Sequence, residues 1–105
     1  MKRLDLVVGP NGSGKTTFVE QRLAPLLPGS VFVNADVIAR DRWPEAPEAH
    51  SYEAARIAST IRETLIEQGE SFVAETVFSH PSKLHLITRA RRSGYVVVLH
   101  VVLVP

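Results

Sequence analysis

The fold of this chain is decided by residues 4–16, Leu4-Asp5-Leu6-Val7-Val8-Gly9-Pro10-Asn11-Gly12-Ser13-Gly14-Lys15-Thr16. Residues 4–8 form a short apolar run, interrupted by Asp5, that ends in glycine, which is typical of a buried parallel strand. The next residues have the spacing Gly-x4-Gly-Lys-Thr of a phosphate-binding loop (Walker A motif), and a helix is predicted over residues 16–24. A strand, a glycine-rich loop and a helix in this order predict an α/β domain that binds phosphate.

The chemistry of the loop follows from its residue types. Glycine tolerates the turns that let backbone N–H groups wrap a phosphate, and the positive end of the following helix points at the same anion. Lys15 is predicted to neutralise the outer phosphates, and Thr16 to offer its hydroxyl to Mg²⁺. The alternative, an ordinary glycine turn, is disfavoured because the motif lies between a strand and a helix. The residues assigned to the nucleotide are Gly9, Pro10, Asn11, Gly12, Ser13, Gly14, Lys15, Thr16 and Thr17.

Strands and helices alternate along the rest of the chain. Strands are predicted over residues 4–8, 31–33, 71–74 and 95–104, and helices over residues 16–24, 36–42, 48–68 and from His80-Pro81 to Gly94. One face of the long helix is predicted to be apolar, with Ala54, Ala58, Ile61 and Leu65. Such alternation implies right-handed crossovers and a parallel sheet, with ligands bound beyond the carboxyl ends of the strands. Because residues 95–104 are almost continuously β-branched, they are predicted to form a central strand.

Polar side chains follow the second and third predicted strands, so they are expected to meet the loop in one crevice. Asp36 has two interpretations. In the first its carboxylate accepts a proton from an attacking hydroxyl or helps to hold magnesium, and in the second it caps a helix. Glu75 is predicted to lie near the metal, with a solvated strand end as the alternative. Thr76 either orients a substrate or closes a turn. Arg40 and Arg42 lie near Asp36 in the sequence and are candidates to contact a phosphate.

Other candidate residues have simpler interpretations. Trp43 and Tyr52 either line a substrate pocket or pack against the fold. The four histidines lack metal-ligand spacing, and His100 is expected to be a hydrogen-bonded core residue. The arginines of the last predicted helix are expected to lie on a solvated face; they are Arg89, Arg91 and Arg92.

Composition limits the class of protein. The chain has 105 residues, 45% of them hydrophobic and 22% charged, which predicts one soluble domain. The charged residues are scattered along the sequence and leave a net charge of +1. This gives no electrostatic case for nucleic acid or an anionic membrane as partner. The absence of cysteine fits a cytoplasmic protein. No signal peptide is recognised, and no apolar run has the length of a membrane span.

The ordered set of motifs resembles the zeta toxin family of phosphate-loop kinases. Besides the loop, the resemblance rests on three segments: residues 33–40 with the sequence VNADVIAR, residues 72–76 with FVAET, and residues 94–98 with GYVVV. It implies a three-layer, nucleoside-kinase-like parallel sheet of the P-loop NTPase type, here truncated to about four strands. It covers nearly the whole chain.

The resemblance also implies an activity, which is transfer of the ATP γ-phosphate to a hydroxyl of a small molecule. Asp36 matches the family's catalytic base, Lys15 and Thr16 match its nucleotide and magnesium ligands, and Glu75 matches its substrate-side acid. Zeta toxins proper phosphorylate UDP-N-acetylglucosamine and are inhibited by a small antitoxin, so both are expectations here. Val77 departs from the pattern, because similar segments usually carry a threonine there.

Residues 1–105 are expected to be one incomplete kinase-like domain. Family members continue into a lid whose arginines contact the phosphates and into a further strand, and without that strand residues 96–104 would form an unpaired edge. Two alternatives to a kinase stay open: a nucleotide-binding remnant without transferase activity, and a general ATP or GTP hydrolase. The sequence does not decide between ATP and GTP.

Overall fold

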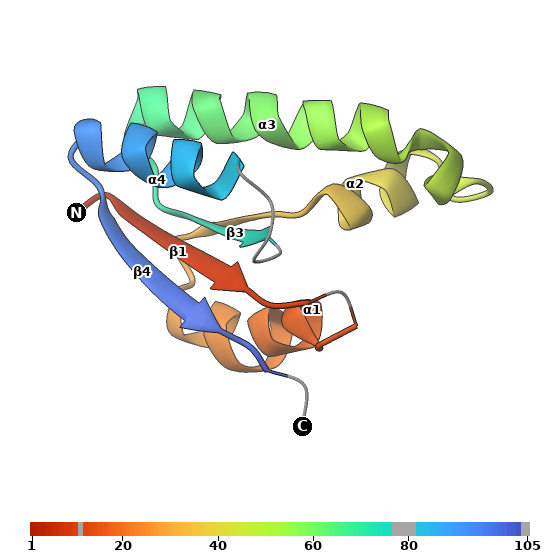
Figure 1. Ribbon diagram of the computed structural model, residues 1–105, viewed down its shortest axis with the longest axis horizontal. Coiled ribbons are helices and arrows are strands. Elements are labelled where there is room, and N and C mark those ends of the chain that lie inside the picture. Colours follow the sequence, from red (N-terminus) through yellow and green to blue (C-terminus); the bar gives the residue numbers. More distant parts are fainter. Residues whose placement is uncertain (11, 77–81, 104–105) are drawn as a thin grey trace.

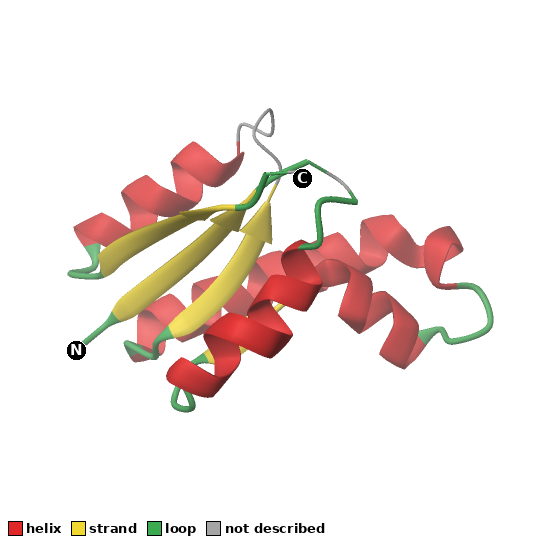
Figure 2. Ribbon diagram, turned by 90° about the horizontal axis from the view of Figure 1, so that it is seen from below, coloured by secondary structure: helices red, strands yellow, loops and turns green. Residues whose placement is uncertain are grey.

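The computed structural model has an α/β fold built on one parallel sheet; it describes residues 1–10, 12–76 and 82–103. The four strands are β1 (Arg3–Val8), β2 (Val31–Val33), β3 (Phe72–Thr76) and β4 (Val96–Val101), in the order β2-β3-β1-β4. All pairs are parallel, and Figure 2 shows the strands running toward the same end of the sheet. The predicted parallel α/β sheet is therefore confirmed.

The sheet is covered on both faces, which gives three layers (Figure 1). One face carries α1 (Lys15–Phe18), a π-helical turn (Val19–Leu23) and a 3₁₀ turn (Ala24–Leu26). The other face carries α2 (Ala35–Arg42), a 3₁₀ turn (Pro47–His50), α3 (Ser51–Gln68) and α4 (Ser82–Arg92). A β-strand packed on both faces is mostly apolar, which explains Leu4, Leu6, Val7 and Val8 in β1.

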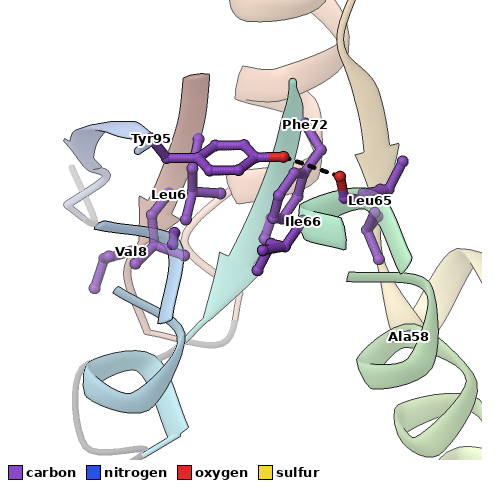
Figure 3. Close-up of a cluster of buried hydrophobic side chains, with 11 residues drawn as sticks. Leu6, Val8, Ala58, Leu65, Ile66, Phe72 and Tyr95 are labelled. Carbon is purple, nitrogen blue, oxygen red and sulfur yellow. Dashed lines mark hydrogen bonds between the residues drawn. The ribbon is translucent and has the colours of Figure 1, made fainter. Parts of the chain in front are cut away.

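The core has one cluster on each face of the sheet. Leu4, Leu6 and Val8 of β1 point toward α3 and α4, and Figure 3 shows the labelled part of this cluster. Val7 points the other way and packs against the π-helical turn. Tyr95 closes the larger cluster: its hydroxyl lies 2.9 Å from the carbonyl oxygen of Leu65 and 2.7 Å from that of Glu70. The apolar face predicted for the long helix is confirmed, since Ala54, Ala58 and Leu65 are buried.

The strand that composition predicted to be central is at the edge, where the family resemblance had placed residues 96–104. β4 pairs with β1 from Arg3–Val96 to Val8–Val101, and within the described residues it has no neighbour on its other side. Leu99 and Val101 are each more than half exposed. A run of β-branched residues indicates a strand, but how many neighbours that strand has depends on the topology of the sheet. β1 and β3 are the strands with neighbours on both sides.

Element boundaries differ from the predictions by a few residues, with one larger difference. The first helix is α-helical only as far as Phe18, although helical turns continue to Leu26 and thus past Pro25, where a stop was predicted. β3 is longer than predicted and includes Glu75 and Thr76, whereas β4 is shorter. Gly69 and Gly94 have φ of 72° and 87°, the left-handed conformation of helix ends. The predicted helix start at His80-Pro81 lies outside the described residues.

Among the residues that the structure describes, no helix combines the length and apolar character that crossing a membrane requires.

Candidate functional site

A cavity of about 780 Å³ opens at the carboxyl ends of β1, β2 and β3. Its lining includes residues from each of the three clusters that the sequence predicted to converge: the glycine loop, the segment after β2 and the end of β3. In chain order the lining residues are Leu6, Gly12, Gly14, Lys15, Thr16, Thr17, Val33, Asn34, Ala35, Asp36, Ala55, Ala58, Ser59, Arg62, Ala74, Glu75, Thr76, Lys83 and Leu86. The predicted convergence is therefore confirmed.

The glycine loop is shaped by close backbone contacts. The N–H of Gly9 donates to the carbonyl of Thr76 at 3.2 Å, which ties the loop to the end of β3. A Cβ on Gly9 would lie 2.4 Å from the carbonyl oxygen of Val102, so only glycine fits there. Gly14 precedes α1 with φ of 86°, a left-handed conformation in which other residues are strained. Asn11 lies outside the described residues.

Lys15 is held against its own loop. Its ammonium group donates to the carbonyl oxygens of Gly9 at 2.8 Å and Pro10 at 3.1 Å. These bonds place a positive charge at the mouth of the loop, and the residue lines the cavity. The loop also contains a buried hydroxyl, Ser13 Oγ, that has no hydrogen-bond partner in the described structure.

Three polar side chains from three different elements meet at the start of α1. The hydroxyl of Thr16 donates to Glu75 Oε2 at 3.1 Å, and Asn34 Nδ2 donates to the same carboxylate oxygen at 2.5 Å. Asn34 Nδ2 also lies 3.5 Å from Thr16 Oγ1. The arrangement brings one hydroxyl and one carboxylate together, and oxygen donors of this kind are what Mg²⁺ prefers.

Asn34 was not predicted as a site residue, yet it connects two parts of the site. Its side-chain oxygen accepts hydrogen bonds from the backbone N–H groups of Asp36 at 2.7 Å and Val37 at 3.2 Å, so it is the N-cap of α2. Its amide nitrogen meanwhile positions Glu75. The signal was available, because asparagine is among the preferred capping residues and Asn34 lies two residues before the predicted start of the helix at residue 36.

The cap formed by Asn34 excludes one of the two interpretations of Asp36. Helix capping by Asp36 is wrong, because that position belongs to Asn34 and Asp36 is the second residue of α2. The Asp36 carboxylate lines the cavity and is exposed. It makes no hydrogen bond or ion pair to any described residue. A carboxylate at this place is available to a ligand.

Glu75 is partly buried, and this affects its ionisation. Burial raises the pKa of the Glu75 carboxyl, and the charge of Asp36 adds to the shift. The hydrogen bonds from Asn34 and Thr16 and the charge of Lys15 act in the opposite direction without cancelling it. The negative charge on Glu75 therefore destabilises the folded state, a cost that a cation at the site would reduce.

We expect Glu75→Gln to raise the free energy of unfolding at neutral pH. A carboxyl whose folded-state pKa is raised favours folding below its ordinary value of 4.5 and disfavours it above the folded-state pKa. The gain should therefore shrink as the pH falls toward 4. Urea unfolding at pH 7 and pH 4 measures it, with Glu67→Gln, an exposed change on α3, as the control. A loss of stability at pH 7 would contradict the prediction.

The structure places the remaining predicted residues in different surroundings. Thr17 and Thr76 line the cavity, whereas Arg40 is exposed on α2 and is not part of the lining. Trp43 and Tyr52 do not line it either: Trp43 stacks on His50 with ring centroids 4.3 Å apart, and Tyr52 is 75% exposed. Two cationic lining residues were missed, Arg62 of α3 and Lys83 of α4. An arginine within an amphipathic helix gives no sequence signal of a site.

A second polar cluster lies away from the cavity lining, across β1 and β4. Asp5 is fully buried, and its carboxylate accepts two hydrogen bonds from Arg3, at 2.7 and 2.8 Å. His100 Nε2 lies 2.8 Å from the same carboxylate, which confirms the predicted hydrogen bond, but the side chain is 21% exposed on the edge strand and is not part of the core. Burial alone would raise the pKa of Asp5, but the hydrogen bonds and charges of Arg3 and His100 outweigh burial and lower it.

Comparisons with known proteins agree with this architecture. A solved chain from the PezAT chromosomal toxin-antitoxin system of the human pathogen Streptococcus pneumoniae is similar in fold, with a TM-score of 0.75 and 15% sequence identity. The similarity covers 96% of the present chain and 47% of that chain, so the present chain spans about half of its length. No curated protein matches the sequence.

The sequence itself matches one family model over its whole length. The model is that of the zeta toxin, and it covers residues 1–105, so it includes the glycine loop and the ends of β2 and β3. Together with the parallel sheet and the loop at the end of β1, this match shows that the chain belongs to the zeta toxin family and has a P-loop, kinase-like fold.

Proposed function

We propose that this chain forms the nucleotide-binding part of an ATP-dependent kinase that phosphorylates a hydroxyl of a small molecule. The observation that carries the proposal is the position of Asp36. Its carboxylate has no partner in the described structure and lines the same cavity as Lys15 and Thr16. A proton acceptor and a phosphate-binding loop that share one cavity are what phosphoryl transfer to a hydroxyl requires.

The proposed reaction exchanges one P–O bond for another. Asp36 accepts the proton of the acceptor hydroxyl, whose oxygen forms a bond to the γ-phosphorus of ATP. The bond between the γ-phosphorus and the β–γ bridging oxygen breaks, and its electrons leave with ADP. Lys15 stabilises the negative charge on the phosphates, assisted by the backbone N–H groups of the loop.

The residues at the start of α1 fit a magnesium ion. Thr16 and Glu75 supply only oxygen atoms, and the raised pKa of Glu75 shows a charge that lacks full compensation. Thr16 would hold the ion directly, while Glu75 and Asn34 orient the Thr16 hydroxyl. Magnesium, when bound, would neutralise charge on the β- and γ-phosphates.

The acceptor and partner that we propose come from the family. UDP-N-acetylglucosamine is the first acceptor to test, and ATP the first donor, with GTP as its comparison. An antitoxin-like protein is the proposed partner, supported by the similarity in fold to a chain from a toxin-antitoxin system. A cytoplasmic location fits these substrates.

Transfer of the labelled γ-phosphate of ATP tests the proposal. With Mg²⁺, the complete protein should form ADP and labelled product only when UDP-N-acetylglucosamine or another hydroxyl acceptor is present. Lys15→Ala should abolish transfer and weaken ATP binding, because it removes the cation of the loop. ADP formation at the same rate without any acceptor would indicate a hydrolase instead. ATP binding without turnover on a panel of nucleotide sugars and sugars would indicate a binding module.

A further inference from the structure

The wall of the cavity opposite the glycine loop is built from α3 and α4, and its charged residues are both cations. α3 contributes Arg62, and α4 contributes Lys83. The carboxylates of the lining, Asp36 and Glu75, come instead from α2 and β3. Apart from Lys15 of the glycine loop, the charges of the cavity are therefore segregated, with the carboxylates at the strand ends and the cations on these helices.

Arg62 has no counter-ion of its own. It is partly buried, and it makes no ion pair or hydrogen bond through its side chain to any residue that the structure describes. Its neighbours one turn away on α3 are all uncharged: Ala58, Ser59, Leu65 and Ile66. The adjacent acid, Glu63, is paired with Arg89 at 3.2 Å. Lys83, by contrast, already has an interaction within the chain.

Keeping a partly buried guanidinium without a counter-ion is costly. Burial lowers the pKa of the Arg62 guanidinium, with the charge of Glu63 opposing the shift, and the group still remains protonated because an arginine pKa lies so far above neutrality. A charge in this position destabilises the fold unless an anion pairs with it. An anionic ligand in the cavity would supply that pairing.

The place of Arg62 in the fold favours the acceptor over the nucleotide as its partner. The glycine loop leads into α1 on one face of the sheet, whereas α2 and α3 lie together on the other face (Figure 1). Arg62 is thus on the same side as Asp36, the residue that would contact the acceptor hydroxyl. The planar guanidinium fork matches the two oxygens of a carboxylate or a phosphate.

We propose that Arg62 is a specificity-determining residue that binds an anionic group, a phosphate or a carboxylate, on the acceptor. This rests on the proposed kinase function, since it assumes that the nucleotide occupies the loop. Acceptors that carry such a group are then preferred over neutral ones, and Arg62 contributes to binding of the acceptor without contributing to binding of ATP.

The test separates the two sites by filling the loop first. The complete protein and the variants Arg62→Gln, Arg62→Lys and Arg56→Gln are saturated with a non-hydrolysable ATP analogue and Mg²⁺. Pyrophosphate and malonate are then titrated separately by calorimetry, as probes for a phosphate and a carboxylate group. Arg56 is a matched control because it is exposed on the same helix and does not line the cavity.

We expect all four proteins to bind the ATP analogue equally. Arg62→Gln should lower the affinity for the preferred probe by about tenfold or more, which corresponds to the loss of a charged hydrogen bond. Arg56→Gln should leave that affinity unchanged. Arg62→Lys should retain part of the affinity, because it keeps the charge but loses the fork. The thermal midpoint of Arg62→Gln should not fall, since the lost charge has no partner; a lower midpoint would indicate a structural role instead.

Besides a lower thermal midpoint of Arg62→Gln, three results would overturn the assignment. The first is equal probe affinity in Arg62→Gln and Arg56→Gln, and the second is that neither probe binds to the unmodified protein. The third is weaker binding of the ATP analogue in Arg62→Gln, because that would place Arg62 at the donor. Failure of the unmodified protein to bind the analogue would instead overturn the proposed function, and the assignment of Arg62 with it. Normal analogue binding with an unchanged probe affinity leaves the kinase proposal intact.

Discussion

Replacing Asp36 by asparagine is expected to slow phosphoryl transfer about a hundredfold to ten-thousandfold, the usual contribution of a general base. The change keeps the size of the side chain but removes its ability to accept a proton. ATP binding should be unchanged, because Asp36 does not belong to the glycine loop and makes no contact that holds the loop in place. The effect should therefore fall on kcat and spare the affinity for ATP.

The same helix provides the control for this experiment. Asp41 is also an exposed aspartate of α2, but it does not line the cavity. Asp41→Asn should keep the unmodified rate in an assay of labelled phosphate transfer with the complete protein. If Asp36→Asn turns over at the rate of Asp41→Asn, Asp36 is not the base and the proposed mechanism is wrong.

Removal of the Asp5 side chain is expected to have the largest effect on stability. Asp5→Ala would leave Arg3 and His100 without the carboxylate that binds both, and breaking a buried pair in this way costs about 3 kcal/mol. We take the lower end of the usual range because the Arg3 side chain is 37% exposed and its charge is partly screened by water. The edge strand β4 should loosen as well, since His100 connects it to β1.

The contribution of Asp5 should depend on pH in a definite direction. A carboxyl whose folded-state pKa is lowered stabilises the fold above its ordinary value of 3.8, and this stabilisation is lost as the pH falls through the folded-state pKa. Urea unfolding of the unmodified protein and Asp5→Ala should therefore differ most near neutral pH and converge in acid. Asp41→Ala, an exposed change, should alter stability by less than about 0.5 kcal/mol. A difference that persists undiminished in strong acid would show that packing, not charge, is what Asp5 contributes.

Local sequence predicted the parts of the fold that depend on short-range rules. The glycine loop needs glycine where Val102 passes close to Gly9 and where Gly14 has a positive φ, so its spacing was visible in the sequence. The helix ends at Gly69 and Gly94 follow the same logic. The order of strands and helices then placed Asp36, Glu75 and the loop at one end of a parallel sheet, as the structure confirms.

Other features were beyond sequence analysis because they depend on residues far apart in the chain. The apolar run of β4 has the composition of a central strand, so the family resemblance, and not the composition, indicated the edge position that pairing with β1 alone gives it. Asp5 looked like an interruption in an apolar run until Arg3 and His100 were seen to surround it, and His100 is 95 residues away. The pattern of α3 predicted its buried face, yet gave no sign that Arg62 reaches the cavity.

The sequence by itself determined the phosphate-binding loop, the alternation of strands and helices, and the family, because each of these rests on residue types at fixed short spacings. Only the tertiary structure decided which residue caps α2, how Thr16, Asn34 and Glu75 share hydrogen bonds, and which cations face the acidic side of the cavity. The physical reason is that these side chains come from separate elements. Their hydrogen bonds, burial and charge partners exist only once the sheet has brought the ends of those elements together.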